Sequence, residues 1–463
     1  MGFCAHRIRV SGGLSGMTQC IRQLSFGFLD HKHLVGDFGG GNLSSDGGLM
    51  LVSAADRQLG LTQALSRLVT DHRDPTKVIH GLDEMLRQRV YQITCGYEDC
   101  NDADDLRSDP VLKTAIGRLP ETDPDLASQP TLSRFENRVT RTQLRRMAEV
   151  FVDLFVQRQA SCAPRWIILD FDATDDEVHG QQQFEAFNGF YDEHCFLPLL
   201  VTAQVGAGPQ ELLVAMLRPG NVHASHSALP VLKRLVRKLR EAWPEVRILL
   251  RADNGFGVPA IYDWCDENDV FYLINLAKNS RLQAIAEPHM DRARAEFSET
   301  GEKVRNLHAA TYAAKDWTHE RRVLIKAEVS AEGENPRFIV TNLRCGDPTR
   351  QYDLYALRGD AENRIKELKR DLKMDRTSCH RFVANQFRVF LHAAAFVLHS
   401  HLRRCLKGTP LENAQACTLQ RQLLKLGVRV RETVRRVWFH FASSCPVQQL
   451  WEPLLIRLNA APT

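Results

Sequence analysis

RWIILDFD (165–172), an apolar run that ends in acids, opens the stretch of sequence that decides the fold. Short apolar runs between turn residues are typical of strands, whereas apolar residues recurring every three or four positions are typical of helices. The segments that follow are two strands, FLPLLVTAQVG (196–206) and ELLVAML (211–217), a helix, HSALPVLKRLVRKLREAW (226–243), a strand, VRILLRAD (246–253), a helix, VPAIYDWCDEND (258–269), and a strand, VFYLINLA (270–277). This β-β-β-α-β-α-β order predicts a mixed sheet with helices on its faces.

The same order, followed by a charged helix near residue 362, is that of a ribonuclease-H-like fold. Residues 278–350 separate the last strand from that helix and contain alternating stretches such as RRVLIKAEV (321–329). A structureless loop of that length is improbable in a compact domain. We therefore predict a ribonuclease-H-like, mixed-sheet α/β catalytic core with a β-rich insertion over the active site.

The rest of the chain divides by composition. The predicted units are a poorly ordered N-terminus (1–29) in which Met17 is a candidate start, a helical N-terminal domain (30–160), a catalytic core (161–277 and 351–405), a β-rich insertion (278–350) and a basic C-terminal region (406–463). The glycines of Gly36–Gly48 lack the Gly-Lys-Ser/Thr ending of a phosphate loop, so they indicate turns.

Composition excludes several classes of protein. The chain has 463 residues, 44% of them hydrophobic and 25% charged, which is typical of a folded soluble protein. No uninterrupted apolar run is long enough to cross a membrane, and the N-terminus lacks the apolar region of a secretory signal. Twelve cysteines, mostly scattered singly, favour reduced thiols in the cytoplasm. A net charge of +4 does not by itself indicate nucleic acid, but the chain is visibly basic after Arg358, which suits a phosphate backbone.

Five polar residues recur at helical spacing in YALRGDAENRIKELK (355–369). They are Tyr355, Arg358, Glu362, Lys366 and Lys369, separated by three, four, four and three positions. At roughly 100° per residue they would share one side of a helix. A second stripe, Ala361, Ile365, Leu368 and Leu372, would be the buried side. The alternative is an ordinary solvated, charged helix.

Three acids then line up at the ends of predicted elements. Asp172 ends the first strand, Asp253 ends the fourth, and Glu362 lies on the charged helix. Carboxylates that converge beside a sheet repel each other unless a cation joins them, and these oxygen ligands suit Mg²⁺ or Mn²⁺. Two such ions would support phosphoryl transfer.

Each acid has an alternative reading. Asp170 would point to the same strand face as Asp172 and is a competing or supporting acid. Asp253, in Asp-Asn-Gly, could be a plain turn residue. His223 and His226 are better explained by capping and packing than by metal binding.

The motif Tyr-x2-Arg-x3-Glu-x6-Lys, matched by Tyr355, Arg358, Glu362 and Lys369, resembles the DDE-type transposases of bacterial insertion sequences in the branch with a β-rich insertion. LDFDATDDEVHG (169–180), FNGFYDEHCFLPL (187–199), RADNGFG (251–257), RGDAENRIKELKRDL (358–372) and SCHRFVANQFR (378–388) resemble more narrowly the insertion-sequence family numbered thirteen-eighty. The likeness runs from about residue 128 to about residue 400.

The resemblance implies a transposase that binds the terminal inverted repeats of its element, cuts with Mg²⁺, for which Mn²⁺ can substitute, and joins the 3′ ends to target DNA. It implies a metal-binding triad of Asp172, Asp253 and Glu362, and a helical N-terminal domain that binds the element's ends. A homodimer on paired ends, in the cytoplasm at the nucleoid and without a membrane, is implied as well.

The resemblance also implies residues that hold the DNA. Tyr355, Arg358, Lys366 and Lys369 would grip the transposon end, and Trp317 would stack a flipped base during hairpin formation; the alternative for Trp317 is a core aromatic. Two rival functions stay open: a ribonuclease-H-fold nuclease without strand transfer, and a catalytically silent DNA-binding protein. The intact acids disfavour the second.

Overall fold

A central mixed sheet organises the protein, whose computed structural model describes residues 23–460. The strand order is β12-β13-β15-β11-β10-β4-β8-β9, and β14 pairs with β13. Its strands are β4 (Trp166–Ala173), β8 (Leu199–Val205), β9 (Glu211–Met216), β10 (Arg247–Ala252), β11 (Val270–Leu276), β12 (Val304–Tyr312), β13 (Arg321–Ser330), β14 (Gly333–Glu334) and β15 (Arg337–Thr341). β4 and β11 run parallel to β10, whereas β8 and β15 run antiparallel to their neighbours. The predicted mixed-sheet α/β fold is confirmed.

Helices cover both faces of this sheet. Alternate strand residues such as Leu169 and Phe171 join one apolar cluster with α8 (Ala228–Ala242), α9 (Pro259–Glu267) and α10 (Ser280–Thr300). On the opposite face, Leu249 and Leu273 pack with α11 (Pro348–Ala356). The buried α13 (Phe382–Cys405) and the amphipathic α7 (Arg141–Arg158) contact β9 at the other end of the sheet.

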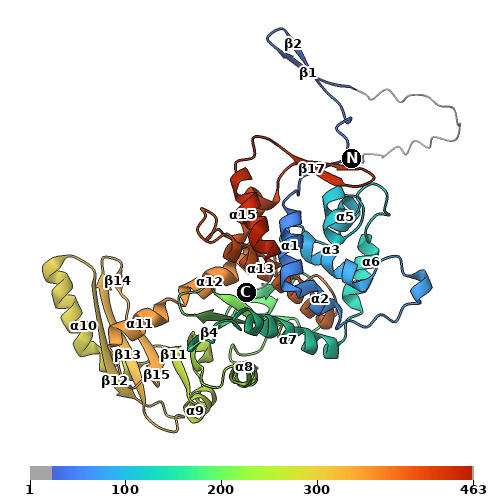
Figure 1. Ribbon diagram of the computed structural model, residues 1–463. Helices are drawn as coiled ribbons and strands as arrows, with labels where there is room; N and C mark the ends of the chain where they lie inside the picture. Colours follow the sequence, from blue (N-terminus) through green and yellow to red (C-terminus); the bar gives the residue numbers. More distant parts are fainter. Residues whose placement is uncertain (1–22, 461–463) are drawn as a thin grey trace, which may run out of the picture.

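The segment 278–350 differs from the expected separate insertion domain. It begins with α10, and its strand β15 pairs antiparallel with β11, so β12, β13 and β15 widen the central sheet (Figure 1). The alternating sequence predicted the strands but not the strand with which they pair. The edge of β11 would otherwise have unpaired backbone N–H and C=O groups, and β15 pairs with them. The segment is therefore an extension of the core sheet.

The chain segment that connects β4 to β8 forms a small sheet, which the sequence analysis did not predict. It consists of β5 (Asp176–Glu177), β6 (Ala186–Asn188) and β7 (Glu193–Phe196), in the order β5-β7-β6. Asp176 is buried and accepts hydrogen bonds from the hydroxyl of Thr377. This contact fixes the small sheet to the segment that follows the charged helix.

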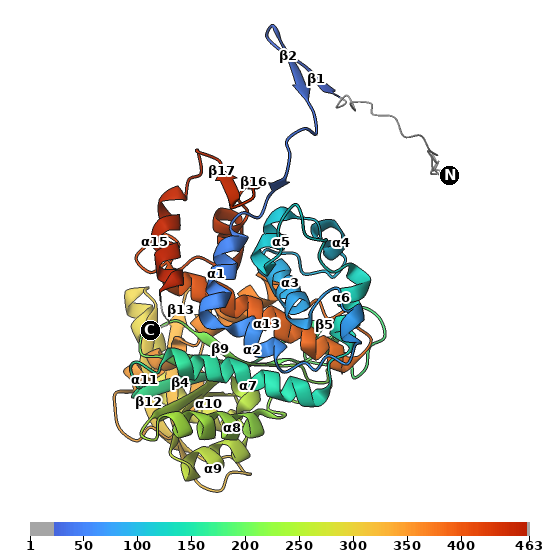
Figure 2. The same cartoon turned by 45° about the vertical axis from the view of Figure 1, so that its right-hand side comes forward.

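The N-terminal part is rich in helices. They are α1 (Leu49–Leu59), α2 (Leu61–Ser66), η1 (Pro75–Lys77), α3 (Leu82–Thr94), α4 (Asp102–Leu106), α5 (Pro110–Ile116) and α6 (Gln129–Asn137), followed by α7. They share one apolar core with α13, which contacts α3, α1 and α6 (Figure 2). The ion pair of Arg89 with Glu136 is buried in this core, and Arg388 of α13 lies beside it.

The two ends of the described chain also meet. β16 (Val428–Glu432) pairs with β17 (Val437–Phe441) and with β3 (Leu43–Ser44), while α15 (Gln448–Asn459) packs on α1. Before β3, the hairpin of β1 (Leu24–Leu29) and β2 (Lys32–Gly36) extends away from the body (Figures 1 and 2). Of the N-terminus predicted to be poorly ordered (1–29), Leu24–Leu29 form β1, whereas residues 1–22 and the expectation for Met17 lie outside the described residues.

Within residues 23–460, no helix combines the length and the apolar character that crossing a membrane requires.

Candidate active site

Two of the three predicted acids are brought together by strand register. In the parallel pair β4–β10, Asp170 lies opposite Arg251 and Phe171 opposite Ala252, so Asp172 and Asp253 follow side by side. Both lie at the carboxyl ends of neighbouring parallel strands, where open α/β sheets bind ligands. The Asp253 carboxylate is oriented by the backbone N–H of Gly255, which donates to it at 2.9 Å.

The third acid reaches this site through an arginine. Arg358, which directly precedes α12 (Gly359–Lys366), places one guanidinium nitrogen 3.1 Å from a carboxylate oxygen of Asp172 and donates with the other to Glu362. Only 7% of Arg358 is exposed, whereas the Glu362 side chain is 44% exposed. Arg358 is therefore a buried bridge between the strand acid and the helix acid.

The pKa values show the electrostatic coupling among these groups. Burial, together with the negative charges of Asp253 and Glu362, raises the pKa of Asp172 to about 7, against the opposing effect of Arg358. Burial also raises the pKa of Asp253, and again the Arg358 charge lowers it. Three carboxylates and one guanidinium thus share a weakly solvated space in which an added positive charge would be stabilised.

The donor set fits a hard divalent cation. Among residues 23–460, no three His, Cys, Asp or Glu side chains already stand close enough together to hold a metal ion. Asp172, Asp253 and Glu362 nevertheless supply the oxygen ligands that Mg²⁺ and Mn²⁺ prefer. In this arrangement the compensating charge between Asp172 and Glu362 comes from Arg358.

Asp170, the competing acid, is already paired. Its two carboxylate oxygens each lie 2.7 Å from a nitrogen of the fully buried Arg251, and Gln210 donates to it at 2.9 Å. Arg251 also donates to the backbone carbonyl of Leu354 in α11. Asp170 therefore fastens the sheet to the helical segment that carries the site, which fits a supporting acid.

The charged stripe was predicted as one helix, but the structure divides it. α11 ends at Ala356, α12 begins at Gly359, and a wider π-type turn, η3 (Glu367–Asp371), follows. The predicted buried stripe is confirmed, because Ala361, Ile365, Leu368 and Leu372 are all buried. Arg358 lies at the break between α11 and α12, where it contacts the strand acid Asp172.

The polar members of the stripe consequently differ in accessibility. Tyr355 is buried, and burial raises its pKa to about 12. Lys366 is exposed, whereas Lys369 forms an ion pair with Asp175 just after β4. The structure brings Tyr355, Arg358 and Lys369 to the acid site and leaves Lys366 facing solvent.

Trp317 does not reach this site. Its ring packs edge-on against Tyr262 and Tyr312 and belongs to the apolar cluster on the α8–α10 face of the sheet. Tyr355 belongs to the cluster on the opposite face. The base-stacking role implied for Trp317 does not fit this position, and the core-aromatic alternative does.

Two features of the site were missed. Tyr191, at the tip of the β6–β7 hairpin, places its hydroxyl 3.4 Å from the backbone carbonyl of Ala173, next to Asp172. Asp175 holds Lys369. The turn sequence FNGFYDEH (187–194) could have predicted the hairpin, since Asn-Gly between apolar residues is typical of one.

His223 forms a hydrogen bond with the nearby Ser225 hydroxyl at 2.8 Å.

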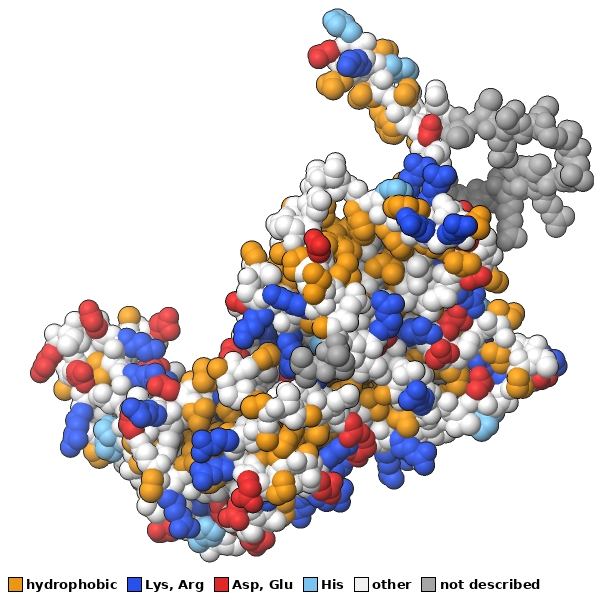
Figure 3. Space-filling view, viewed as in Figure 1, with side chains coloured by type: hydrophobic (Ala, Val, Ile, Leu, Met, Phe, Trp, Pro, Cys, Tyr) orange, Lys and Arg blue, Asp and Glu red, His pale blue; other side chains and the backbone are white. Residues whose placement is uncertain are grey.

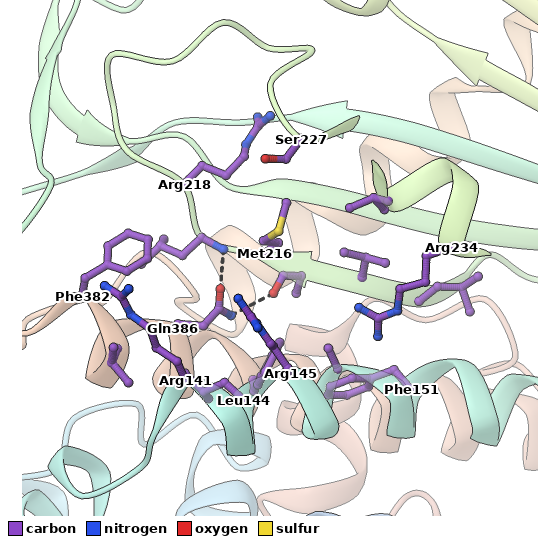
Figure 4. Close-up of a pocket in the computed structure, with 18 of the residues that line it drawn as sticks. Arg141, Leu144, Arg145, Phe151, Met216, Arg218, Ser227, Arg234, Phe382 and Gln386 are labelled. Atoms are coloured by element: carbon purple, nitrogen blue, oxygen red, sulfur yellow. Dashed lines mark hydrogen bonds between the residues drawn. The ribbon is translucent and has the colours of Figure 1, made fainter. Parts of the chain in front are cut away.

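An apolar pocket lies elsewhere. A cavity of about 390 Å³ is lined by α7, β9, α8 and α13, with Arg145 and Arg234 at its edge (Figure 4). None of the three acids lines this pocket.

On the molecular surface, Lys and Arg side chains are interspersed with acidic ones over the face shown in Figure 3.

Acids at the ends of neighbouring parallel strands, with a third acid on a nearby helix, are an arrangement that metal-dependent phosphoryl transfer can use. The family model described as transposase DDE domain group 1 matches residues 26–463, and the chain belongs to this family of DNA-cleaving transposases, which depend on divalent metal. The comparison with curated proteins found no match. A solved structure, "Cryo-EM structure of piggyBac transposase synaptic complex with hairpin DNA", is similar at 10% identity and a TM-score of 0.41, over 82% of this chain and 79% of that one.

Proposed function

We propose that this transposase mobilises an insertion sequence of the family numbered thirteen-eighty. It binds the terminal inverted repeats, cleaves the ends and joins the freed 3′ ends to target DNA. The observation that carries the proposal is the juxtaposition of Asp172 and Asp253 at neighbouring strand ends, with Glu362 joined to them through Arg358. Its cellular place would be the cytoplasm, at the nucleoid.

In this proposal Asp172, Asp253 and Glu362 hold Mg²⁺, for which Mn²⁺ can substitute. The bound metal would activate the attacking oxygen and neutralise charge on the leaving oxygen. Tyr355, Arg358, Lys366 and Lys369 grip the DNA end: the cationic side chains neutralise phosphate charge, and the phenol hydrogen-bonds a phosphate oxygen.

We include a homodimer on paired ends in the proposal. The β1–β2 hairpin supports it, because most of its apolar side chains are exposed. The exposed ones are Leu24, Phe26, Phe28, Leu29, Leu34 and Val35. Exposed apolar patches mark interaction surfaces.

Substitution of the acids tests the assignment. Asp172→Asn, Asp253→Asn and Glu362→Gln should each abolish cleavage of a labelled terminal-repeat duplex while gel shifts show end binding retained, since each removes a ligand charge but no DNA contact. Asp360→Asn, an exposed acid on the same helix as Glu362, is the matched control and should cut normally. Wild-type cleavage by any triad variant would refute the assignment.

The products separate transposase from nuclease. A denaturing gel resolves nicked, hairpin and double-strand-cut ends, and a supercoiled target plasmid captures joined ends. Joined product in Mg²⁺ is expected from the wild-type protein. Efficient cutting that never yields joined ends would favour a nuclease without strand transfer.

A further inference from the structure

The tip of the β6–β7 hairpin holds an exposed aromatic side chain beside the acid site. Phe190 is 86% exposed. Single exposed apolar residues are common on protein surfaces, so exposure alone indicates nothing. The position of Phe190 beside the acid site, and the residues around it, indicate a function for this exposed ring.

Tyr191, the next residue, ties this tip to the carboxylates. Its hydroxyl lies 3.4 Å from the carbonyl of Ala173, and its ring lies 4.9 Å from that of Phe190 in an edge-on arrangement. Burial raises the pKa of Tyr191, and the negative charges of Asp175, Asp172 and Asp253 raise it further. The aromatic tip is therefore within electrostatic reach of two acids of the proposed triad.

The turn fixes the direction of the Phe190 backbone. The N–H of Phe190 donates to the Asn188 side chain at 3.0 Å, and the N–H of Asp192 donates to the Asn188 carbonyl at 2.8 Å. The Asn188 amide in turn donates to the carbonyl of Gly220 at 2.7 Å. A side chain on a pre-ordered turn loses less conformational entropy when a ligand covers it.

Charge near the tip selects what can cover Phe190. Asp175 is paired with Lys369, but Glu193 is an acid beside the tip, and its pKa is raised by burial and by the charge of Asp175. Glu193 disfavours a phosphate next to Phe190, whereas it does not repel the uncharged face of a nucleobase. Bases stack readily on aromatic side chains, and this stacking tolerates any base.

We propose that Phe190 is the stacking surface for one unpaired base of the DNA end that is cut at the acid site. The inference rests on the proposed function and deepens it. The base must leave the duplex to reach Phe190, and such unstacking is easiest where pairing is already lost. Phe190 then holds the DNA end in position without taking part in the phosphoryl transfer.

Binding measured without divalent metal tests the proposal apart from catalysis. Terminal-repeat duplexes carry one unpaired nucleotide at successive positions across the cleavage site, each paired with a duplex that is abasic there. At one position the wild-type protein should bind the unpaired base about 5- to 150-fold more tightly than the abasic site. Phe190→Ala should bring this ratio close to one, and Phe190→Trp should preserve it.

Phe38→Ala is the matched control, because Phe38 is 88% exposed and follows the β1–β2 hairpin, two residues after the end of β2. It should keep the wild-type ratio. A wild-type ratio in Phe190→Ala, or no base preference at any position in a wild-type protein that binds and cuts its ends, would overturn the stacking role alone. Wild-type protein that neither binds nor cuts terminal repeats would overturn the proposed function itself.

Discussion

At the scale of single residues, Arg358 has the most consequential position. The motif predicted a residue that contacts DNA, whereas the structure shows it between Asp172 and Glu362. A buried carboxylate that loses its partner keeps its desolvation cost. Arg358 therefore stabilises the acid cluster until a metal ion or a DNA phosphate changes the balance of charge.

Replacing Arg358 should make folding stability depend on metal. Arg358→Ala should lower the free energy of unfolding by about 2 kcal/mol without metal, because Asp172 is left unpaired. Mg²⁺ should then raise the melting temperature of the variant more than that of wild type, since ligands that bind only the folded state stabilise it. Thermal melts with and without Mg²⁺ measure both effects. Arg370→Ala, an exposed neighbour, should behave like wild type; equal Mg²⁺ shifts in all three proteins would contradict the bridge role.

Lys366 gives a residue-scale test of DNA contact. It is exposed beside the acid site, so Lys366→Ala should reduce the salt dependence of end binding, by about 0.9 in the slope of log K against log salt. Binding titrations at several salt concentrations measure the slope. Lys407→Ala removes the same charge just beyond α13 and should leave the slope unchanged. Identical slopes for both variants and wild type would mean that Lys366 is only solvated.

At the scale of elements, sequence reasoning was strongest where local pattern and strand order decide the outcome. Neighbouring parallel strands placed Asp172 beside Asp253 as expected, and the buried stripe of α12 and η3 was confirmed. Prediction from the sequence was weakest where contacts between residues far apart in the chain determine the structure. The break before Arg358 and the pairing of β15 with β11 depend on tertiary contacts that the local sequence does not contain. For Trp317 the local sequence left both alternatives open, and its contacts with Tyr262 and Tyr312 favour the core aromatic.

Helix α13 is buried between the N-terminal helices and β9, and this burial predicts a sensitivity of the fold to acid. Burial, aided by nearby arginines such as Arg388 for His392 and Arg403 for His399, lowers the pKa of His392, His399 and His401 to about 3 each. The unfolded chain therefore binds more protons than the folded one between about pH 6.5 and pH 3.

The contribution of these histidines to stability should accordingly be full above pH 6.5 and fall as pH decreases. At pH 5.5 each histidine should cost about 1.4 kcal/mol. Denaturant unfolding at pH 7.5 and 5.5 should show a smaller acid loss in His401→Gln than in wild type, because glutamine does not titrate. His440→Gln, an exposed histidine in β17, should not change the loss. The same acid loss in both variants would exclude a contribution from His401.

At the scale of the whole molecule, the β1–β2 hairpin is the part that a single chain does not explain. A lone two-stranded hairpin is marginally stable in water, so its apolar side chains favour a further partner. Phe26 is 66% exposed and Phe28 is 73% exposed. Reciprocal docking of two identical hairpins on two copies would form a closed symmetric dimer, the commonest oligomer, and would bring two DNA ends together.

Light scattering coupled to gel filtration tests this arrangement. Wild-type protein should form a dimer with or without DNA, and the double variant Phe26→Ser, Phe28→Ser should be monomeric at the same concentration. Loss of an aromatic anchor typically costs about 2 kcal/mol or more of binding free energy, so two losses should weaken association about a thousandfold. Val434→Ser, at the exposed tip of the β16–β17 hairpin, is the control and should remain dimeric. The double variant should still melt like wild type, because these rings contact little of the body; a stable dimer in that variant would place the interface elsewhere.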